Sequence, residues 1–139
     1  MRQVVVFNAH RTRRVKKRAA SGYVNRVLSS AGVKEARVSV VFVGSRYCKM
    51  INRRYLGHNS VTDVISFPLG QGRLFEGEIY VNLDRAATQA RQYRVGFNNE
   101  VARLVIHGTL HLVGYDDGTE EKAGVMKAVE DRHVRSWFH

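Results

Sequence analysis

Two histidines and a carboxylate near the C-terminal end of the chain have the spacing of a metal site. His107 and His111 are four residues apart, so on a helix both imidazoles project from one face, about 6 Å apart along the axis. One Zn²⁺ can bridge that separation and take a third ligand from beyond the turn at Gly114, with a position left open for water. The spacing therefore predicts a hydrolytic metalloenzyme, with Asp117 as the natural third ligand.

The carboxylate of Asp117 also has a structural interpretation. The run from Asp117 to Glu120, Asp-Gly-Thr-Glu, has the spacing of a helix N-capping box, so Asp117 could simply begin the last helix. Asp116 and His133 are lesser ligand candidates. The sequence leaves open whether Asp117 binds metal or caps a helix.

The segment that carries the histidines is apolar nearly all round when it is placed on a helix, and its main polar strip is Glu100, Arg103, His107 and His111. Buried imidazoles must be hydrogen-bonded, charged beside a partner or bound to metal. A pair of hydrogen-bonded core histidines is the alternative to a metal site. Zinc peptidases of the His-Glu-x-x-His type have their general base directly after the first histidine, where this chain has Gly108. The sequence therefore disfavours peptide hydrolysis, whereas metal-activated water could attack a phosphodiester.

The elements that must position these residues alternate along the chain. Residues 1–139 are expected to form a single α+β domain, with about four strands in a mixed sheet and helices packed against it. Thr12, Ser45, Asp84 and Asn98 are the expected caps of the first four helices. The expected strands are 4–7, 37–43, 61–67 and 78–83, and the expected helices are 12–30, 45–55, 84–94, 98–113 and 119–137.

Composition narrows the class of protein. The chain has 139 residues, 44% of them hydrophobic, and no run long enough to cross a bilayer. Its single cysteine, Cys48, cannot form an internal disulfide, so a reducing cytoplasm is expected. Any metal must be held by histidine and carboxylate. We expect no membrane partner.

The net charge of +11 comes mostly from one segment. Residues 1–34 contain nine Lys or Arg and no acid, whereas residues 35–139 carry 14 basic and 12 acidic side chains. Such a block can bind a polyphosphate without sequence specificity, although a solvated helix face is the simpler alternative. The imbalance favours a nucleic-acid partner. The candidate phosphate-binding residues are Arg11, Arg13, Arg14, Lys16, Lys17 and Arg18.

Three blocks of the sequence resemble a known family. The run from His107 to Asp116, His-Gly-Thr-Leu-His-Leu-Val-Gly-Tyr-Asp, resembles the signature of the YbeY family of bacterial endoribonucleases. The run from Ile51 to Pro68 resembles a second block of that family, which includes Thr-Asp-Val-Leu-Ser-Phe-Pro, and Gly-Glu-Ile at residues 77–79 resembles a third. The order and spacing agree over about residues 35–135.

The resemblance implies a zinc-dependent, single-strand-specific endoribonuclease that matures the 3′ end of 16S ribosomal RNA and takes part in ribosome quality control. The implied partners are ribosomal RNA and the small ribosomal subunit, with ribosomal proteins or a GTPase assembly factor as further candidates. The implied fold resembles metalloproteases, with a central metal-binding helix. Carried over by position, His107 and His111 are ligands of one Zn²⁺ per chain.

Two residues depart from the family pattern. Asp117 stands where the family usually has a third histidine, and Leu56 stands where it has an arginine that suits phosphate binding. Arg53, Arg54 or His58 could substitute for that arginine from the same loop.

Thr62, Asp63 and Ser66 belong to the second family block and could line a substrate cleft or serve only as turn and edge-strand hydrogen bonders. The sequence identifies no general acid or base, so the catalytic groups beyond a metal-bound water are unknown at this point. Two alternatives remain, a non-catalytic ribosome-assembly or RNA-binding factor with structural zinc and a metallopeptidase-like hydrolase.

Overall fold

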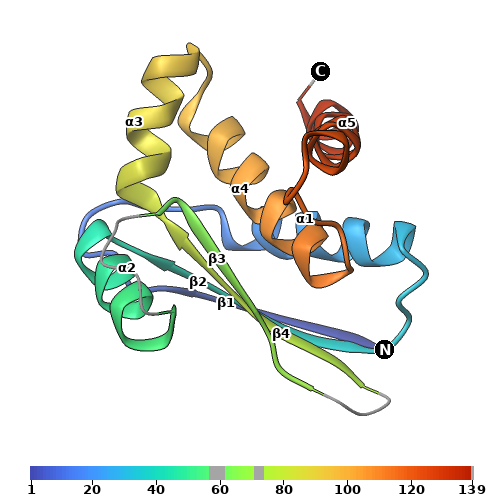
Figure 1. The fold of residues 1–139 in the computed structure, drawn as a ribbon. Coiled ribbons are helices and arrows are strands. Elements are labelled where there is room, and N and C mark those ends of the chain that lie inside the picture. The colour runs from blue at the N-terminus through green and yellow to red at the C-terminus, as the bar shows by residue number, and fades with distance from the viewer. Residues whose placement is uncertain (57–61, 71–73, 139) are drawn as a thin grey trace.

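The computed structural model describes residues 1–56, 62–70 and 74–138, except for the side chains of Tyr55 and Leu56. Four strands form one mixed sheet in the order β1-β2-β4-β3 (Figure 1). β1 and β4 each pair in parallel with β2, and β3 pairs antiparallel with β4. This sheet confirms the expected α+β class. The strands are β1 (Arg2–Asn8), β2 (Ala36–Val43), β3 (Val64–Pro68) and β4 (Phe75–Asn82).

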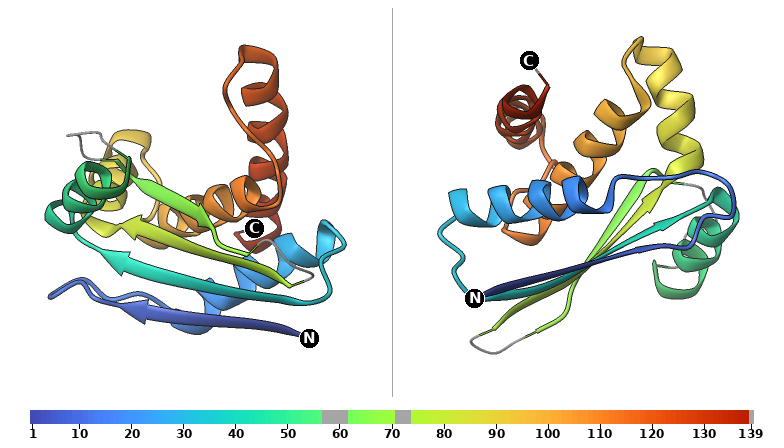
Figure 2. Two further views of the ribbon diagram at one scale, coloured as in Figure 1. Left: turned by 60° about the horizontal axis from the view of Figure 1, so that its bottom comes forward. Right: turned by 180° about the vertical axis from the view of Figure 1, so that it is seen from behind.

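The helices pack mainly on one face of the sheet, where α1 and α4 lie directly against the strands (Figures 1 and 2). Alternate residues of β2 and β4 turn inward to meet them, including Val40, Phe42 and Ile79, which are fully buried. Among the described residues, no helix is long and apolar enough to cross a membrane. The helices are α1 (Lys17–Ser30), α2 (Ser45–Ile51), the π-helical turn η1 (Asn52–Leu56), α3 (Leu83–Tyr93), α4 (Phe97–Leu112) and α5 (Glu120–Trp137).

α4 is the central helix, with α1, α3 and α5 around it and the sheet beneath it. Gly108 and Gly77 explain how closely it approaches the strands. A Cβ at Gly108 would lie 2.7 Å from Cγ2 of Ile79, and one at Gly77 would lie 2.7 Å from Cδ1 of Leu112. Position 108 therefore faces the sheet and cannot carry the glutamate of a peptidase. The Oγ of Ser66 donates to the Gly108 carbonyl at 2.8 Å and ties β3 to α4.

The expected start of the first helix was wrong. α1 begins at Lys17 rather than after Thr12. The backbone N–H groups of Thr12 and Arg13 both donate to Nδ1 of His10, and the Asn8 amide donates to the Arg13 carbonyl. These bonds hold the preceding residues in a loop.

Asp84 does not cap α3 as expected. Asn82 accepts hydrogen bonds from the backbone N–H groups of Asp84 and Arg85 and is the N-cap. Asp84 is instead engaged with His10 and Arg13 and accepts from the backbone N–H of Ser45. Its carboxylate thus joins the loop after β1 to the start of α2. Ser45 and Asn98 were also expected as caps, but the N-cap of α2 is Gly44 and the N-cap of α4 is Gly96.

Candidate metal centre

His107, His111 and Asp117 converge at the C-terminal end of α4. The Nε2 atoms of the two histidines lie 3.2 Å apart, and Oδ2 of Asp117 lies 3.9 Å and 3.8 Å from them. Two nitrogens bound to tetrahedral zinc at about 2.0–2.1 Å are about 3.4 Å apart, so the histidine pair already has the required spacing. The carboxylate oxygen needs to approach by only about half an ångström by the same geometry. The three residues therefore could hold a metal ion.

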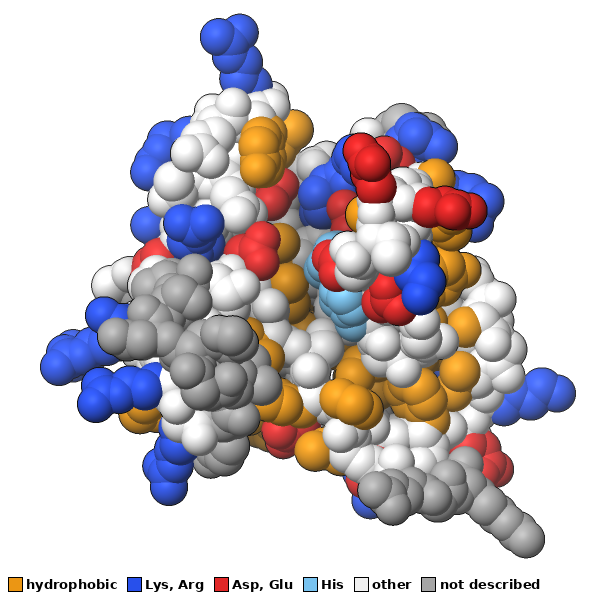
Figure 3. Space-filling model, viewed as in Figure 1, with side chains coloured by type: hydrophobic (Ala, Val, Ile, Leu, Met, Phe, Trp, Pro, Cys, Tyr) orange, Lys and Arg blue, Asp and Glu red, His pale blue; other side chains and the backbone are white. Residues whose placement is uncertain are grey.

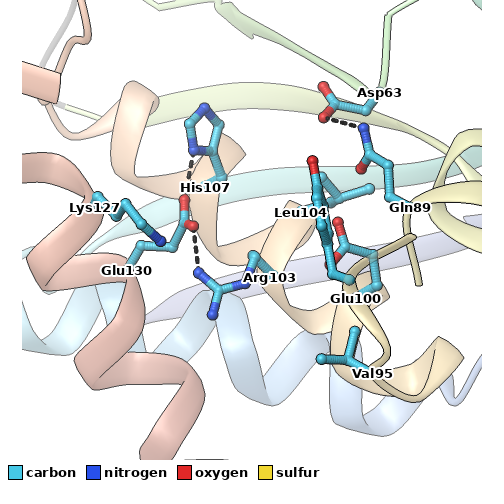
Figure 4. Close-up of a pocket in the computed structure, with 10 residues that line it drawn as sticks. Asp63, Gln89, Val95, Glu100, Arg103, Leu104, His107, Lys127 and Glu130 are labelled. Carbon is cyan, nitrogen blue, oxygen red and sulfur yellow. Dashed lines mark hydrogen bonds and ion pairs between the residues drawn. The ribbon is translucent and has the colours of Figure 1, made fainter. Parts of the chain in front are cut away.

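Glu130 of α5 fixes the orientation of His107. The Nδ1–H of His107 donates to Oε1 of Glu130 at 2.6 Å (Figure 4). This bond leaves Nε2 facing His111. Metal-binding histidines commonly donate their second ring nitrogen to a carboxylate in this way. The other oxygen of Glu130 accepts from Arg103 at 2.6 Å, and Arg103 also donates to Asp131. This chain of charges connects α4 to α5 behind the metal centre.

The two partners shift each other's pKa values in opposite directions. Burial disfavours the charged imidazole, but the hydrogen bond and the charge of Glu130 outweigh it and raise the pKa of His107. Burial likewise opposes ionisation of Glu130, but its hydrogen bonds from His107 and Arg103 prevail and lower its pKa. Without metal, the pair is therefore an ion pair in slightly acidic solution.

The structure distinguishes between the two interpretations of Asp117. The N-cap of α5 is Thr119, whose side chain accepts from the backbone N–H of Lys122 at 3.1 Å. Asp117 lies two residues earlier, beside the histidines, and its capping role is thereby excluded. Asp116 instead accepts from the backbone N–H of Gly118 and pairs with Lys122.

The candidate metal centre lies in a cleft. A hollow of about 510 Å³ is lined by Thr62, Asp63 and Ser66 together with both histidines and Asp117. Figure 3 shows histidine side chains within a hollow that acidic side chains border. The expectation that the second family block contributes to a cleft is consistent with this placement. Thr62 and Asp63 also hold the chain in place, because their carbonyls accept from the side chain and backbone of Asn82.

The basic segment lies elsewhere. Among the described residues, neither hollow beside the triad is lined by residues 11–18. Arg13 pairs with Asp84 at 3.2 Å, and Arg11 lines a separate hollow with His10 and Ser45. The remaining basic residues of this segment, Arg14, Lys16, Lys17 and Arg18, are exposed.

The proposed substitutes for the family arginine are only partly described. Arg53 and Arg54 are exposed on the π-helical turn η1, whose last residue is Leu56. The side chain of Leu56 and the whole of His58 lie outside the described residues. Asn52, which begins the same turn, is buried and lines the metal cleft.

Sequence reasoning missed Glu130 and named His133 instead. His133 lies on α5 but outside the cluster that could hold a metal. A signal for Glu130 was present, because it falls between Met126 and Val134 at i, i+4 spacing, on the buried side of α5. An acidic residue at a core position needs a cationic or hydrogen-bonding partner.

Comparison with known proteins identifies the family. The family model described as Endoribonuclease YbeY matches residues 6–137. The chain belongs to this family. It is 42% identical over 112 residues to the endoribonuclease YbeY of Chlorobium phaeovibrioides, covering 81% of this chain and 76% of that protein. It is 33% identical over 118 residues to the YbeY endoribonuclease of Parabacteroides distasonis, covering 85% and 83% of the two chains.

A solved structure has the same fold. The solution structure of a Thermotoga maritima protein aligns with a TM-score of 0.68 at 25% identity, covering 95% of this chain and 87% of that one. Membership of the YbeY family supports an endoribonuclease role for the chain. Together with the position of Gly108, it leaves no support for the peptidase alternative.

Proposed function

We propose that this YbeY-family chain is a zinc-dependent endoribonuclease that cleaves single-stranded ribosomal RNA in the cytoplasm, at the 3′ end of 16S RNA, and acts in ribosome quality control. The observation that carries the proposal is the 3.2 Å approach of the two Nε2 atoms beside Asp117 in an open cleft. The small ribosomal subunit and its assembly proteins are the proposed partners.

The donor set fits zinc, because two imidazole nitrogens and one carboxylate oxygen leave a fourth tetrahedral position for water. An ion bound there would supply Lewis-acid polarisation and lower the pKa of water. His107, His111 and Asp117 would hold it, and the hydrogen bond to Glu130 favours the His107 tautomer that leaves Nε2 free to bind it. Asp63 is the carboxylate that lines the hollows on both sides of His107, and it is the proposed acceptor of a proton from water.

The exposed cations of the segment from Arg11 to Arg18 are proposed to attract the RNA backbone through its phosphates. Their separation from the metal cleft indicates a role in holding a distant part of the RNA. Arg53 and Arg54 are proposed to contact RNA nearer the cleft.

A matched pair of substitutions tests the proposal. Asp117→Asn removes the charge of the third ligand, and Asp116→Asn makes the same change in the adjacent residue, which lies outside the triad. We expect Asp117→Asn and His111→Ala to lose bound zinc and cleavage of single-stranded RNA, and Asp116→Asn to keep both. Zinc content after purification without added metal and cleavage of single-stranded against double-stranded RNA are the measurements.

Each other outcome has a defined meaning. Zinc bound by the wild type without any cleavage would favour the assembly factor with structural zinc. Absence of zinc binding by the wild type would contradict the site. Equal cleavage by Asp117→Asn and the wild type would remove Asp117 from the ligand set.

A further inference from the structure

A second cavity, of about 500 Å³, adjoins the metal centre on the side of α3 and α5 (Figure 4). His107 and Asp63 line both this cavity and the metal cleft, so the two hollows meet at the triad. Its size is within the range of small-ligand sites. A substrate bound at the metal can therefore extend into it.

Glu100 lines this cavity and has an unsatisfied carboxyl oxygen. It is only 2% exposed, and among the described residues its Oε1 has no hydrogen-bond partner. A buried polar atom without a hydrogen-bond partner destabilises the folded protein, and such atoms are rare in native proteins. Oε1 of Glu100 therefore needs a hydrogen-bond donor that the described residues do not supply.

Three side chains with N–H donors line the same cavity, and each has a carboxylate partner other than Glu100. Arg103 donates to Glu130 and Asp131. Gln89 donates to Asp63 at 3.2 Å, and Lys127 pairs with Asp131 at 3.4 Å. None of these printed bonds reaches Glu100, so its Oε1 remains an unpaired acceptor that suits a ligand edge presenting N–H donors.

The cavity also has an aromatic ring in its lining. Tyr93, the last residue of α3, lines it and is 61% exposed, and an exposed ring is a stacking surface for a base. Glu100 precedes His107 by seven residues, which is two turns or about 10 Å along α4. That distance is comparable to the reach from a phosphate to the far edge of its own base.

We infer that this cavity is a nucleobase subsite in which the Glu100 carboxyl accepts hydrogen bonds from the Watson–Crick edge of a guanine. Guanine presents two adjacent donors, N1–H and the 2-amino group, which match the two oxygens of a carboxylate, whereas uracil presents one donor between two carbonyls. Tyr93 stacks on the same base. The inference rests on the proposed function in taking RNA as the substrate.

Nucleotide binding to protein without added metal tests the inference independently of cleavage. Guanosine, inosine and uridine 5′-monophosphates share one phosphate, so differences between them report on the base. Titration is followed by the backbone amide NMR signals of Gln89 and Leu104, which line the cavity. We expect guanosine monophosphate to bind about tenfold more tightly than uridine monophosphate, with inosine monophosphate, which lacks the 2-amino group, between them.

The substitution Glu100→Gln replaces one carboxyl acceptor by a donor at nearly constant volume, and we expect it to abolish the preference for guanine. Glu121→Gln makes the same change at an exposed position of α5 and should keep the preference. Thermal unfolding of both variants checks the fold. Equal binding of the three nucleotides to the wild type, or an unchanged preference in folded Glu100→Gln, would overturn the inference. Failure of the proposed function would appear instead as a lack of metal-dependent RNA cleavage, whatever the nucleotides do.

Discussion

The carboxylate of Glu130 is expected to control metal affinity although it does not belong to the ligand triad. It accepts from His107 at 2.6 Å on one oxygen and from Arg103 at 2.6 Å on the other. In Glu130→Gln, either the amide NH₂ faces one of these two donors or the side chain turns away. Each arrangement breaks at least one of the two bonds and removes the negative charge beside the imidazole.

The size of the effect follows from this geometry. Loss of such an outer carboxylate typically costs about 10–100-fold in metal affinity, which is about 1.4–2.7 kcal/mol. We expect the Glu130→Gln zinc dissociation constant to rise by that factor, as measured by competition with a chromogenic chelator at neutral pH. Asp131→Asn is the matched control, because it removes the other carboxylate partner of Arg103 without contacting His107.

The reasoning would be refuted by a Glu130→Gln protein that is folded by circular dichroism and binds zinc as tightly as the wild type. An equal loss of affinity in Asp131→Asn would also contradict it. That result would show that zinc affinity depends on the overall charge of α5 and does not depend on the hydrogen bond between Glu130 and His107.

Two further predictions concern stability. Gly108→Ala places a Cβ 2.7 Å from Cγ2 of Ile79, so we expect the free energy of unfolding measured in urea to fall by about 1–3 kcal/mol. The control Gly124→Ala has nothing within 4 Å of the added carbon and should raise this free energy by about 0.5–1 kcal/mol. Equal effects of the two substitutions would contradict the close packing at Gly108. Burial raises the pKa of Glu100 from 4.5 to about 7. Because the unfolded chain releases this proton at lower pH than the folded chain, the free energy of unfolding of the wild type should fall by up to about 3 kcal/mol as the pH rises between those values. Glu100→Gln should therefore gain stability relative to the wild type across that interval, and parallel stability curves for the two proteins would show that Glu100 is not buried in this way.

Much of the site could be predicted from the sequence because its parts are local. The i, i+4 spacing of His107 and His111 fixes their common face on any helix. Alternation in β2 and β4 likewise depends only on neighbouring residues. The N-cap of α3 was predicted less well, because Asn82 and Asp84 can both cap a helix there and only the side-chain geometry shows that Asn82 does so.

The sequence by itself determined the family, the α+β class and the histidine pair, since each is encoded in short-range spacing. Only the tertiary structure decided the role of Glu130, the exclusion of Asp117 from helix capping and the unpaired oxygen of Glu100. These features depend on how α5 and α3 pack against α4, between residues far apart in the chain. Burial and hydrogen-bond partners belong to that packing, and they determine what a carboxylate at a given position can do.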